Sequence, residues 1–525
     1  MPVRMRKDSE KKSSRDNHPG RKATNSGSGG GGRSNLIASL LPLLLKKPKR
    51  LIVVGIIFGA WYFFGGSCNA GGIVSEDSSD GGGGITNKII ETLFSTGLEM
   101  SPEKYDATAI FEPLADNIKN PLPEQFSLLE YAPKRLNQGR QGSCVAWASS
   151  YAARTILEAR KMGVNPNSVA FSPSYLYNQI ALTNCQGSYL PDAMKAMAEN
   201  GNMSFIQFEY DEQSCSNKPD AQEKRAGRKF AIHGFNRLSR GDNAKEIDML
   251  AIKQHLAQGA PVVVGMIVGG TFMNEMRGSE AWSPSKSDYD ASGFGGHAMC
   301  VIGYDDYKEG GSFQIMNSWG EDWGKQGVAW VRYKDFNFFV REAYGIDPMG
   351  NADAPEGTVL NAQIALKLNE GAYIPFKGGS PGMFSTSSPV RQGDLFKVEI
   401  TNDIPCYIYV FGEDTDGTSY VLFPYTEKHS PYCGITGTRL FPKDYSMETD
   451  DIGNRDHIAI VMSSEPIDYN DFNNRISKAN GAFGNKFQQV VGLSDARFSN
   501  GNPIELQVDL KTTPIAAVIL SIDKQ

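Results

Sequence analysis

Three short motifs, far apart but in a fixed order, constrain this chain more strongly than its composition does. Residues 137–147 read NQGRQGSCVAW, residues 295–298 read GGHA, and residues 317–320 read NSWG. They supply the side chains of a candidate thiol site: Gln138, Cys144, His297 and Asn317. The histidine and asparagine follow the cysteine by roughly 150 and 170 residues, close to the roughly 130–150 residues expected when a reactive thiol meets its partners only in the folded protein. The pattern is typical of a thiol hydrolase.

A thiol is a poor nucleophile at its ordinary pKa, so its position in the fold matters. Apolar residues recur at helical spacing from Cys144 to Met162, with Ser143 as a candidate N-cap and Gly163 as the stop. Cys144 would then open a helix. A helix N-terminus and an imidazolium partner both lower a thiol pKa, and His297 would supply the second of these.

The remaining motif residues fit the other roles of a thiol hydrolase. His297 would carry the proton, and Asn317 would hold its ring by accepting from one ring N–H. Gln138 would aim a side-chain N–H at the developing oxyanion, together with the backbone N–H of Cys144. We see no metal-ligand cluster and predict neither a metal nor another cofactor.

These residues resemble the motifs of the papain-type cysteine peptidases. The resemblance covers roughly residues 120–346 and rests on Gln138-Gly139-x-x-Gly142-Ser143-Cys144, Gly296-His297-Ala298 and Asn317-Ser318-Trp319-Gly320-x-x-Trp323-Gly324-x-x-Gly327. Predicted helices at 144–162, 190–201 and 244–258 precede predicted strands at 261–268, 298–303, 313–316 and 327–332, which favours an α+β class. The expected fold is two-lobed, with the thiol on a helical lobe and His297 and Asn317 on a β-barrel-like lobe.

The resemblance also implies supporting residues. Trp319 would shield the contact between Asn317 and His297 from water, and Cys185 would form a disulfide with Cys215. The sequence departs from the family at two positions. Val145 follows the nucleophile where the family usually has tryptophan, and Gln141 replaces a cysteine that commonly forms another disulfide.

The length of 525 residues allows about three domains at roughly 100–200 residues each. We predict the following segments: a basic disordered cytoplasmic tail at 1–50, a transmembrane signal anchor at 51–66, a flexible linker and approach segment at 67–120, a papain-like peptidase domain at 121–346, a linker at 347–385, and a β-rich accessory domain at 386–525.

The N-terminal region carries the only basic excess of a chain whose net charge is −6. Residues 1–50 contain 13 Lys and Arg against 3 Asp and Glu, but they lack interleaved aromatic residues, so we predict no nucleic-acid partner. Residues 51–66 are apolar and uncharged. As a helix they reach about 24 Å against a hydrocarbon core of about 30 Å, with Lys49, Arg50, Trp61 and Tyr62 as interfacial anchors.

The basic flank would keep the N-terminus inside and place the catalytic domain outside the cytoplasm, for example in a bacterial periplasm or at a cell surface. Two alternatives are a cleaved signal peptide and a lipid attached at Cys68. The chain contains seven cysteines, which suits an oxidising compartment if some of them pair.

The C-terminal region shows short β-type runs separated by Asp, Gly, Asn and Pro turns. They lie at 396–400, 406–411, 419–423, 457–462 and 516–521. We predict a small β-sandwich-like domain with a protein as a candidate partner. A disulfide between Cys406 and Cys433 could stabilise it.

The resulting functional prediction is a membrane-tethered cysteine endopeptidase that acts on peptide or protein substrates. The same triad could instead transfer the acyl group to an amine, as an acyltransferase or transpeptidase does. A third reading is a catalytically silent surface scaffold that uses the fold for binding.

Overall fold

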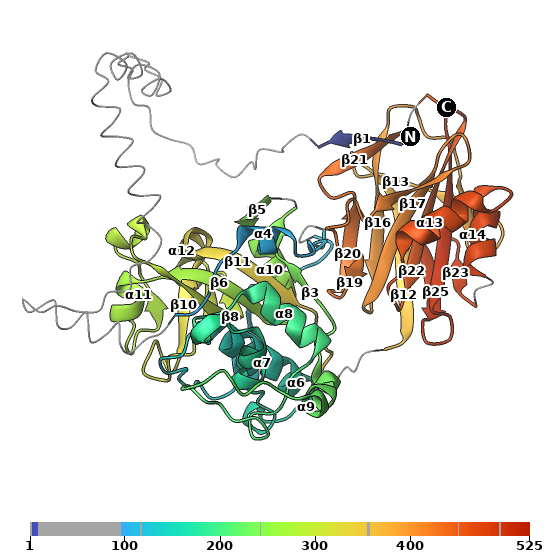
Figure 1. Ribbon diagram of the computed structural model, residues 1–525. Coiled ribbons are helices and arrows are strands. Elements are labelled where there is room, and N and C mark those ends of the chain that lie inside the picture. The colour runs from blue at the N-terminus through green and yellow to red at the C-terminus, as the bar shows by residue number, and fades with distance from the viewer. Residues whose placement is uncertain are drawn as a thin grey trace, which may run out of the picture. The chain divides into compact units, whose positions relative to one another are not determined.

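The computed structural model describes residues 3–8, 96–115, 118–241, 243–353, 357–449, 451–492 and 495–525 (Figure 1). All of these belong to one compact unit, which comprises residues 1–8 and 84–525. Along the chain, a first domain of helices followed by strands ends with β11 (Val340–Ile346), and a second, β-rich domain begins with β12 (Val359–Leu368).

The predicted helix from Cys144 to Met162 is confirmed as one continuous helical stretch. It comprises α5 (Cys144–Ala146), the π-helix η2 (Trp147–Arg154) and α6 (Thr155–Met162). All of η2 is buried, so a 3.6-residue apolar stripe could not reveal its widened turn. Gly163 ends the stretch in the left-handed region, at φ 63°, where a glycine costs least.

Further helices complete the helical lobe. The predicted helix at 190–201 is α8 (Leu190–Glu199), and the other helices are α4 (Pro102–Asp106), α7 (Pro173–Ile180) and α9 (Ala221–Gly227). Single turns of helix connect them: η1 (Leu129–Tyr131), η3 (Pro166–Ser168), η4 (Thr183–Cys185) and η5 (Arg228–Phe230). The predicted disulfide between Cys185 and Cys215 is confirmed, and it joins η4 to the loop after α8.

The second lobe is a mostly antiparallel sheet in the order β3-β11-β6-β8-β9-β10-β7, with β2 paired to β8. Its strands are β2 (Gln125–Ser127), β3 (Phe235–Arg237), β6 (Val262–Val268), β7 (Ala281–Trp282), β8 (Gly295–Asp305), β9 (Ser312–Met316), β10 (Val328–Arg332) and β11. Short elements flank the sheet: β4 (Ser239–Arg240), α11 (Gly270–Asn274), η6 (Ser287–Asp290), η7 (Lys308–Gly310) and α12 (Tyr333–Phe339). The predicted two-lobed α+β class is confirmed.

The predicted helix at 244–258 is correct only in its second half. Residues 243–247 form strand β5 (Asn243–Ile247), which pairs with β4, and α10 (Met249–Ala257) follows. Asp248 separates the two, because its carboxylate accepts the Ala251 N–H at 3.1 Å and caps the helix there.

The C-terminal domain is a sandwich of two sheets, which agrees with the predicted β-rich class but not with its bounds, because β12 begins at Val359, inside the predicted linker at 347–385. One sheet has the order β1-β21-β16-β12-β24-β23, with β13 and β20 alongside, and the other has the order β14-β15-β25-β22-β17-β18, with β19 alongside. The strands are β13 (Tyr373–Ile374), β14 (Phe376–Gly378), β15 (Met383–Thr386), β16 (Leu395–Asn402), β17 (Cys406–Glu413), β18 (Ser419–Phe423), β19 (Tyr432–Cys433), β20 (Gly437–Phe441), β21 (Tyr445–Thr449), β22 (Arg455–Ser463), β23 (Arg497–Ser499), β24 (Ile504–Asp509) and β25 (Ile515–Asp523).

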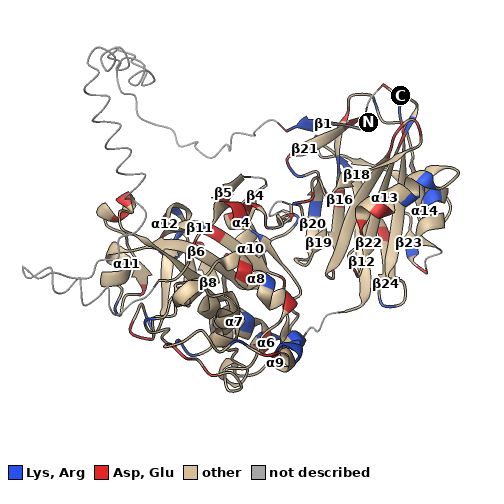
Figure 2. Cartoon of the chain, in the orientation of Figure 1, with Lys and Arg blue, Asp and Glu red and all other residues tan. Residues whose placement is uncertain are grey.

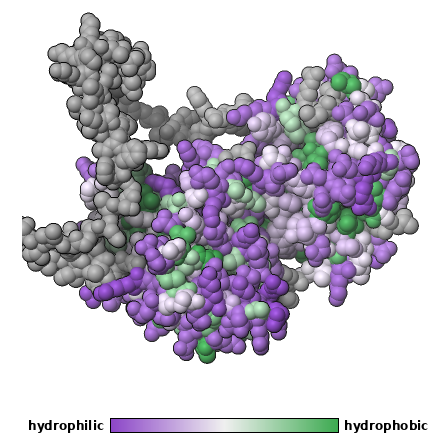
Figure 3. Space-filling view, in the orientation of Figure 1, coloured by the Kyte–Doolittle hydropathy of each residue, from purple (hydrophilic) through white to green (hydrophobic). Residues whose placement is uncertain are grey.

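Side-chain alternation along β17 shows how the sandwich is covered. Ile408 and Val410 point into the core between the sheets, whereas Tyr409 and Phe411 pack on the opposite face beneath α13 (Tyr469–Lys478) and α14 (Phe483–Val491). The two helices lie on this sheet in Figure 1. In Figure 2 both helices have stretches coloured as Lys or Arg, and Lys478 of α13 is exposed. In the view of Figure 3 the described surface is mostly hydrophilic, with apolar residues in small separate patches.

Two predictions about the N-terminal region need correction. Residues 3–7, expected to be part of a disordered tail, form β1 (Val3–Lys7), which pairs antiparallel with β21. The following Asp8 makes an ion pair with Lys397 at 2.6 Å. These nonlocal contacts explain why composition alone suggested disorder.

The predicted single-pass membrane location is also corrected. Within the part of the chain that the structure describes, no helix combines the length and the apolar character needed to cross a bilayer. Residues 51–66 lie outside the described residues, and sixteen helical residues would reach only about 24 Å. The predicted anchor and the extracytoplasmic location that depended on it are therefore unsupported.

The predicted disulfide between Cys406 and Cys433 is absent. The two residues are register partners in β17 and β19, yet both are buried free thiols. Burial raises the pKa of Cys433 to about 11 and that of Cys406 well above its ordinary value. Both thiols are thus neutral and unreactive near neutral pH.

Candidate active site

Cys144 lies where the two lobes of the first domain meet. It is the first residue of α5 and is fully buried, with 0% of its surface exposed. Its sulfur accepts a hydrogen bond from the Ala298 N–H of β8, at 3.4 Å. Since His297 is the preceding residue of β8, the fold brings the predicted nucleophile to the strand that carries the predicted base.

His297 is held by the predicted asparagine. Its Nε2 lies 2.7 Å from Oδ1 of Asn317. The same Oδ1 accepts the backbone N–H of Ser318 at 2.7 Å, which identifies it as the amide oxygen. Nε2 of His297 must therefore carry a proton, and Nδ1 is the basic nitrogen. Among the described residues, Nδ1 has no hydrogen-bond partner.

Trp319 covers the histidine, in agreement with its expected position. Its ring stacks on the imidazole of His297 with centroids 4.3 Å apart and planes at 25°. Trp319 is 1% exposed. The hydrogen bond between His297 and Asn317 is consequently shielded from water on this side, which strengthens it.

Gln138 is buried, and its side chain has one defined orientation. Its Oε1 accepts the hydroxyl of Ser318 at 2.6 Å, and its Nε2 donates to the carbonyl of Gln141 at 2.9 Å. Its backbone N–H donates to the Ser318 carbonyl at 2.8 Å. One N–H of the amide remains for an oxyanion, because an amide nitrogen has two.

The loop before the nucleophile is fixed by Tyr210 rather than by a helix cap. Ser143 occupies the predicted N-cap position, but its hydroxyl caps no backbone N–H. It instead pairs with the Tyr210 hydroxyl at 2.7 Å. That hydroxyl also bonds the Gln138 carbonyl at 2.7 Å, so one phenol holds both ends of the loop.

Gln141 provides a second attachment for this loop. Its side-chain amide donates to the carbonyls of Asp211 and Ser214, at 3.1 and 3.2 Å. The disulfide at Cys215 anchors that neighbouring loop to Cys185. Hydrogen bonds thus replace the covalent link that a cysteine at position 141 would have made.

Residues 96–100, which we call the blocking segment, lie across the site. Leu98 donates its N–H to the Gly296 carbonyl at 3.1 Å. On the other side, the Ser188 N–H donates to the Gly97 carbonyl at 2.9 Å, and the Ser188 carbonyl accepts the next N–H after Leu98 at 3.1 Å. The pairing with Ser188 is parallel.

The blocking segment fits over the thiol because it presents a glycine there. A Cβ on Gly97 would overlap the backbone of Gly142, two residues before Cys144. A Cβ on Gly142 would in turn meet the Gly187 nitrogen at 3.0 Å. Three glycines therefore allow three main chains to pass one another at the nucleophile.

Leu98 fills a pocket beside the site and is 5% exposed. The pocket exists because residue 265 lacks a side chain, since a Cβ there would lie 2.7 Å from Leu98 Cδ2. Leu190 and Glu342 also border this position. Burial raises the pKa of Glu342 to about 7, and its carboxylate accepts the Tyr344 hydroxyl at 3.2 Å.

Coverage by the blocking segment keeps both reacting groups neutral. Burial raises the pKa of Cys144 to about 12, although backbone N–H groups, including those of Ala298 and Gly97, act in the opposite direction. Burial also lowers the pKa of His297 to about 4, against the opposing effect of its Asn317 hydrogen bond. In the covered site both pKa shifts disfavour the expected thiolate–imidazolium pair.

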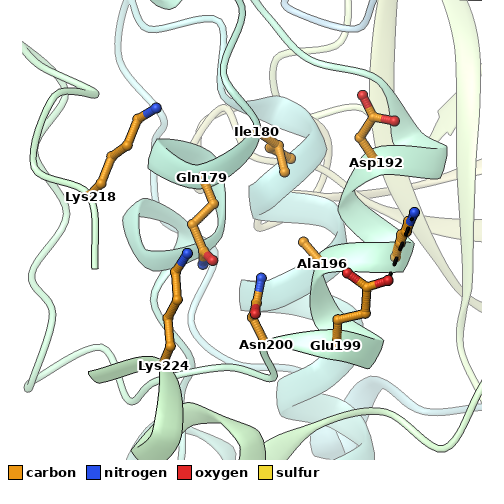
Figure 4. Close-up of a pocket in the computed structure, with 9 residues that line it drawn as sticks. Gln179, Ile180, Asp192, Ala196, Glu199, Asn200, Lys218 and Lys224 are labelled. Carbon is orange, nitrogen blue, oxygen red and sulfur yellow. Dashed lines mark ion pairs between the residues drawn. The ribbon is translucent and has the colours of Figure 1, made fainter. Parts of the chain in front are cut away.

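A separate surface cavity of about 300 Å³ lies between α7, α8 and residues 218–224. Figure 4 shows the side chains around it, including Asp192 and Glu199 from α8 and the lysines at 218 and 224. Neither Cys144 nor His297 lines this cavity. It is therefore not part of the candidate active site.

Sequence reasoning missed three parts of the site. Ser318 follows Asn317 directly, so its place in the motif was a usable signal. Tyr210 precedes Cys215 by five residues, but nothing local indicated that its hydroxyl would reach Gln138. The blocking segment had no signal, because its contacts use backbone groups distant in the chain.

The thiol of Cys144 at a helix start and the pairing of His297 with Asn317 on the other lobe are the arrangement expected of a thiol hydrolase. Residues 123–346 match the sequence model described as papain family cysteine protease. The protein is a cysteine peptidase, and the predicted enzyme class is confirmed. Residues 389–466 match a domain of unknown function, DUF4384.

Individual relatives match less than half of the chain. Cathepsin B-like CP2 of Giardia intestinalis is 27% identical over 218 residues, which are 40% of this chain and 68% of that protein. Cathepsin K of Mus musculus is 27% identical over 238 residues, which are 45% of this chain and 66% of that protein. Among solved structures, xylellain, a cysteine protease from Xylella fastidiosa, has a TM-score of 0.40 and 20% identity, covering 49% of this chain and 97% of that one.

Proposed function

We propose that the protein is an endopeptidase in which Cys144 is the nucleophile, His297 the general acid and base, and Asn317 the residue that orients the imidazole. One observation carries this assignment. Asn317 holds Nε2 of His297 at 2.7 Å, and Nδ1 is left without a partner in the described part of the chain. The neighbouring Ala298 N–H lies 3.4 Å from the Cys144 sulfur.

The reaction follows from these positions. Nδ1 of His297 takes the proton of the Cys144 thiol, and the sulfur attacks the carbonyl carbon of the substrate to form a tetrahedral oxyanion. The C–N bond then breaks, and the imidazolium returns the proton to the leaving amine. A water molecule, deprotonated by Nδ1, attacks the remaining thioester, releases the carboxylic acid and restores the thiol.

Gln138 is the proposed side-chain donor to the oxyanion, together with the Cys144 backbone N–H. The Gln138→Ala variant should lose about 10²–10³-fold in kcat with a much smaller change in KM, because an oxyanion exists only near the transition state. Initial rates on one peptide will separate the two parameters. Gln213→Ala, an exposed change in the same lobe, is the matched control, and equal losses in both variants would remove Gln138 from this role.

The covered site represents a latent form of the enzyme. A substrate must bring its carbonyl to the Cys144 sulfur, where the blocking segment now lies. The Gly97 carbonyl accepts the Ser188 N–H, so its hydrogen bond is made with a group other than the proposed oxyanion donors. The segment can thus exclude substrates without being cut itself.

The test uses the full chain with a recognition site for a sequence-specific protease inserted between Met100 and Ser101. The chain is assayed on a peptide library before and after that cut, and the products are read by mass spectrometry. Hydrolysis yields two fragments, the first ending in a free carboxylate. Joined fragments would indicate acyl transfer, and no turnover together with no labelling of Cys144 by iodoacetamide would leave only the scaffold.

A further inference from the structure

The residues that follow the blocking segment lie between the peptidase domain and the C-terminal domain. We call residues 107–115 and 118–120 the bridging segment. Its Ile110 forms parallel bridges with Arg237 of β3 on one side and with His429 of the C-terminal domain on the other. Ile110 is 1% exposed, so its side chain is enclosed at this junction.

Backbone hydrogen bonds attach the bridging segment to both domains. On the peptidase side, the Arg237 N–H donates to Ala109 at 2.9 Å, and the Phe111 N–H donates to Arg237 at 3.2 Å. On the other side, the Ile110 N–H donates to Lys428 at 2.7 Å, and the Ser430 N–H donates to Ile110 at 3.0 Å. The segment therefore acts as a strand between two partners.

Side chains of the C-terminal domain add polar contacts to the same segment. Arg439 is fully buried, and its Nε donates to the Glu112 carbonyl at 3.0 Å. Its other nitrogens are held by Asn402 and Ile435 of its own domain. Asn120 and Thr438 exchange two hydrogen bonds, at 2.9 and 2.8 Å.

The helix between the two segments is held in the same way. Asp106, the last residue of α4, makes ion pairs with Arg237 of the peptidase domain at 2.9 Å and with Lys428 of the C-terminal domain at 2.6 Å. Only Ser101 and the first four residues of α4 separate Asp106 from the blocking segment. Contacts of the C-terminal domain thus end within six residues of the segment that covers the thiol.

We propose that the C-terminal domain is a regulatory latch, which binds the bridging segment and thereby holds the blocking segment over Cys144. Tethering is the physical basis. A stretch of five residues that binds weakly remains in place when its neighbour is anchored, because the anchor raises its effective concentration at the site. The proposal rests on the peptidase function, and it assigns a role to a domain that otherwise lacks one.

Release of the latch has two routes in this arrangement. A cut between the blocking and bridging segments removes the tether. Alternatively, a partner that occupies the surface around Lys428, Ser430 and Thr438 would compete with the bridging segment and loosen it without a cut. Both routes expose the same thiol.

The experiment measures how fast iodoacetamide labels Cys144 in the uncut full chain, with the labelled peptide identified by mass spectrometry. Because Cys144 is 0% exposed, labelling reports the fraction of molecules in which the blocking segment has left. Lys428→Glu replaces an ion pair with a repulsion and should label about threefold faster. Ile110→Asp places a charge in the enclosed junction and should label at least about tenfold faster.

Lys478→Glu is the matched control, since it makes the same charge change on α13 at an exposed position. It should label at the rate of the parent. Near-equal labelling rates in all variants would overturn the latch. If Ile110→Asp does not fold, the labelling rate of Lys428→Glu alone tests the latch. Faster labelling of the variants without peptide hydrolysis by the cut chain would retain the latch and reject the endopeptidase. Hydrolysis by the cut chain with unchanged labelling of the variants would retain the endopeptidase and reject the latch.

Discussion

Replacing Cys144 with alanine will lower peptide hydrolysis by the cut enzyme by at least about 10⁴-fold in kcat. The sulfur is the only proposed group that bonds to the substrate carbon, so its removal leaves His297 without a proton to take. Peptide binding should persist, because the pocket residues are unchanged. The measurement is the initial rate on a peptide selected from the library, with enzyme concentration set by absorbance.

The control for this variant is Cys300→Ala. Cys300 is another fully buried thiol, three residues after His297 in β8, and its sulfur contacts only the backbone carbonyl of Val301 among the hydrogen-bond partners described. Its loss should leave kcat within about threefold. If Cys144→Ala retained the activity of the parent, the nucleophile would have to be sought elsewhere.

Cutting the chain between the blocking and bridging segments will raise the labelling rate of Cys144 at pH 7 by at least about 10³-fold. A thiol pKa of about 12 leaves about one thiolate in 10⁵ at this pH. An unshifted thiol near pKa 8.5 has about one in 30, and an imidazolium partner increases that fraction further. The measurement is the second-order rate constant for iodoacetamide before and after the cut.

The pH dependence of the Cys144 labelling rate should also differ in shape between the uncut and the cut chain. In the uncut chain, the labelling rate should rise about tenfold per pH unit from pH 6 to 9, because the pH remains far below the pKa of the Cys144 thiol. After the cut, water reaches both groups, so the pKa of Cys144 falls and that of His297 rises. The profile should then reach a plateau near neutral pH. A plateau in the uncut chain would contradict the assignment of burial as the cause.

The stability of the covered state should also depend on pH, because covering the site changes the pKa of His297. The pKa of His297 is lower in the covered state than in water, so protonation favours the uncovered state. The stability of coverage that this group supplies is present above its ordinary pKa of about 6.5 and is lost as the pH falls towards 4. Amide exchange at Leu98, corrected for the intrinsic rate, should therefore accelerate on acidification through this range.

The helix that carries Cys144 could be predicted because its signals are local. Apolar residues at helical spacing indicate the buried face of the helix, and Gly163 indicates the left-handed residue at its end. Both signals lie within the helix or directly next to it. The strands of the sheet lobe were equally visible, since β6 is buried along almost its whole length and reads as an apolar run. The motif residues could be placed together because the family resemblance gave their pairing.

Other features depend on contacts that no local pattern records. β5 was read as helix because its residues are acceptable in either state, and pairing with β4 decided the outcome. β1 exists through its register with β21, more than 430 positions away. The blocking segment is extended backbone between residues 188 and 296, and its five residues contain neither an apolar period nor a turn motif.

The two predicted cysteine pairs also show what the sequence alone cannot determine. Cys185 and Cys215 were paired by resemblance, and they bond. Cys406 and Cys433 were paired by proximity within one domain, and they are indeed neighbours across two strands. Yet strand register does not determine whether two sulfurs bond, because side-chain geometry must also be suitable.

The way Gly97 passes the thiol has a consequence for selectivity. At this point the blocking segment is recognised through carbonyl and N–H groups and through the absence of a side chain, and every polypeptide carries the first two. The main-chain contacts of Gly296 and Ser188 therefore cannot discriminate among peptide sequences. Discrimination must come from side-chain contacts, and we expect the position that encloses Leu98, with Glu342 at its border, to supply one of them.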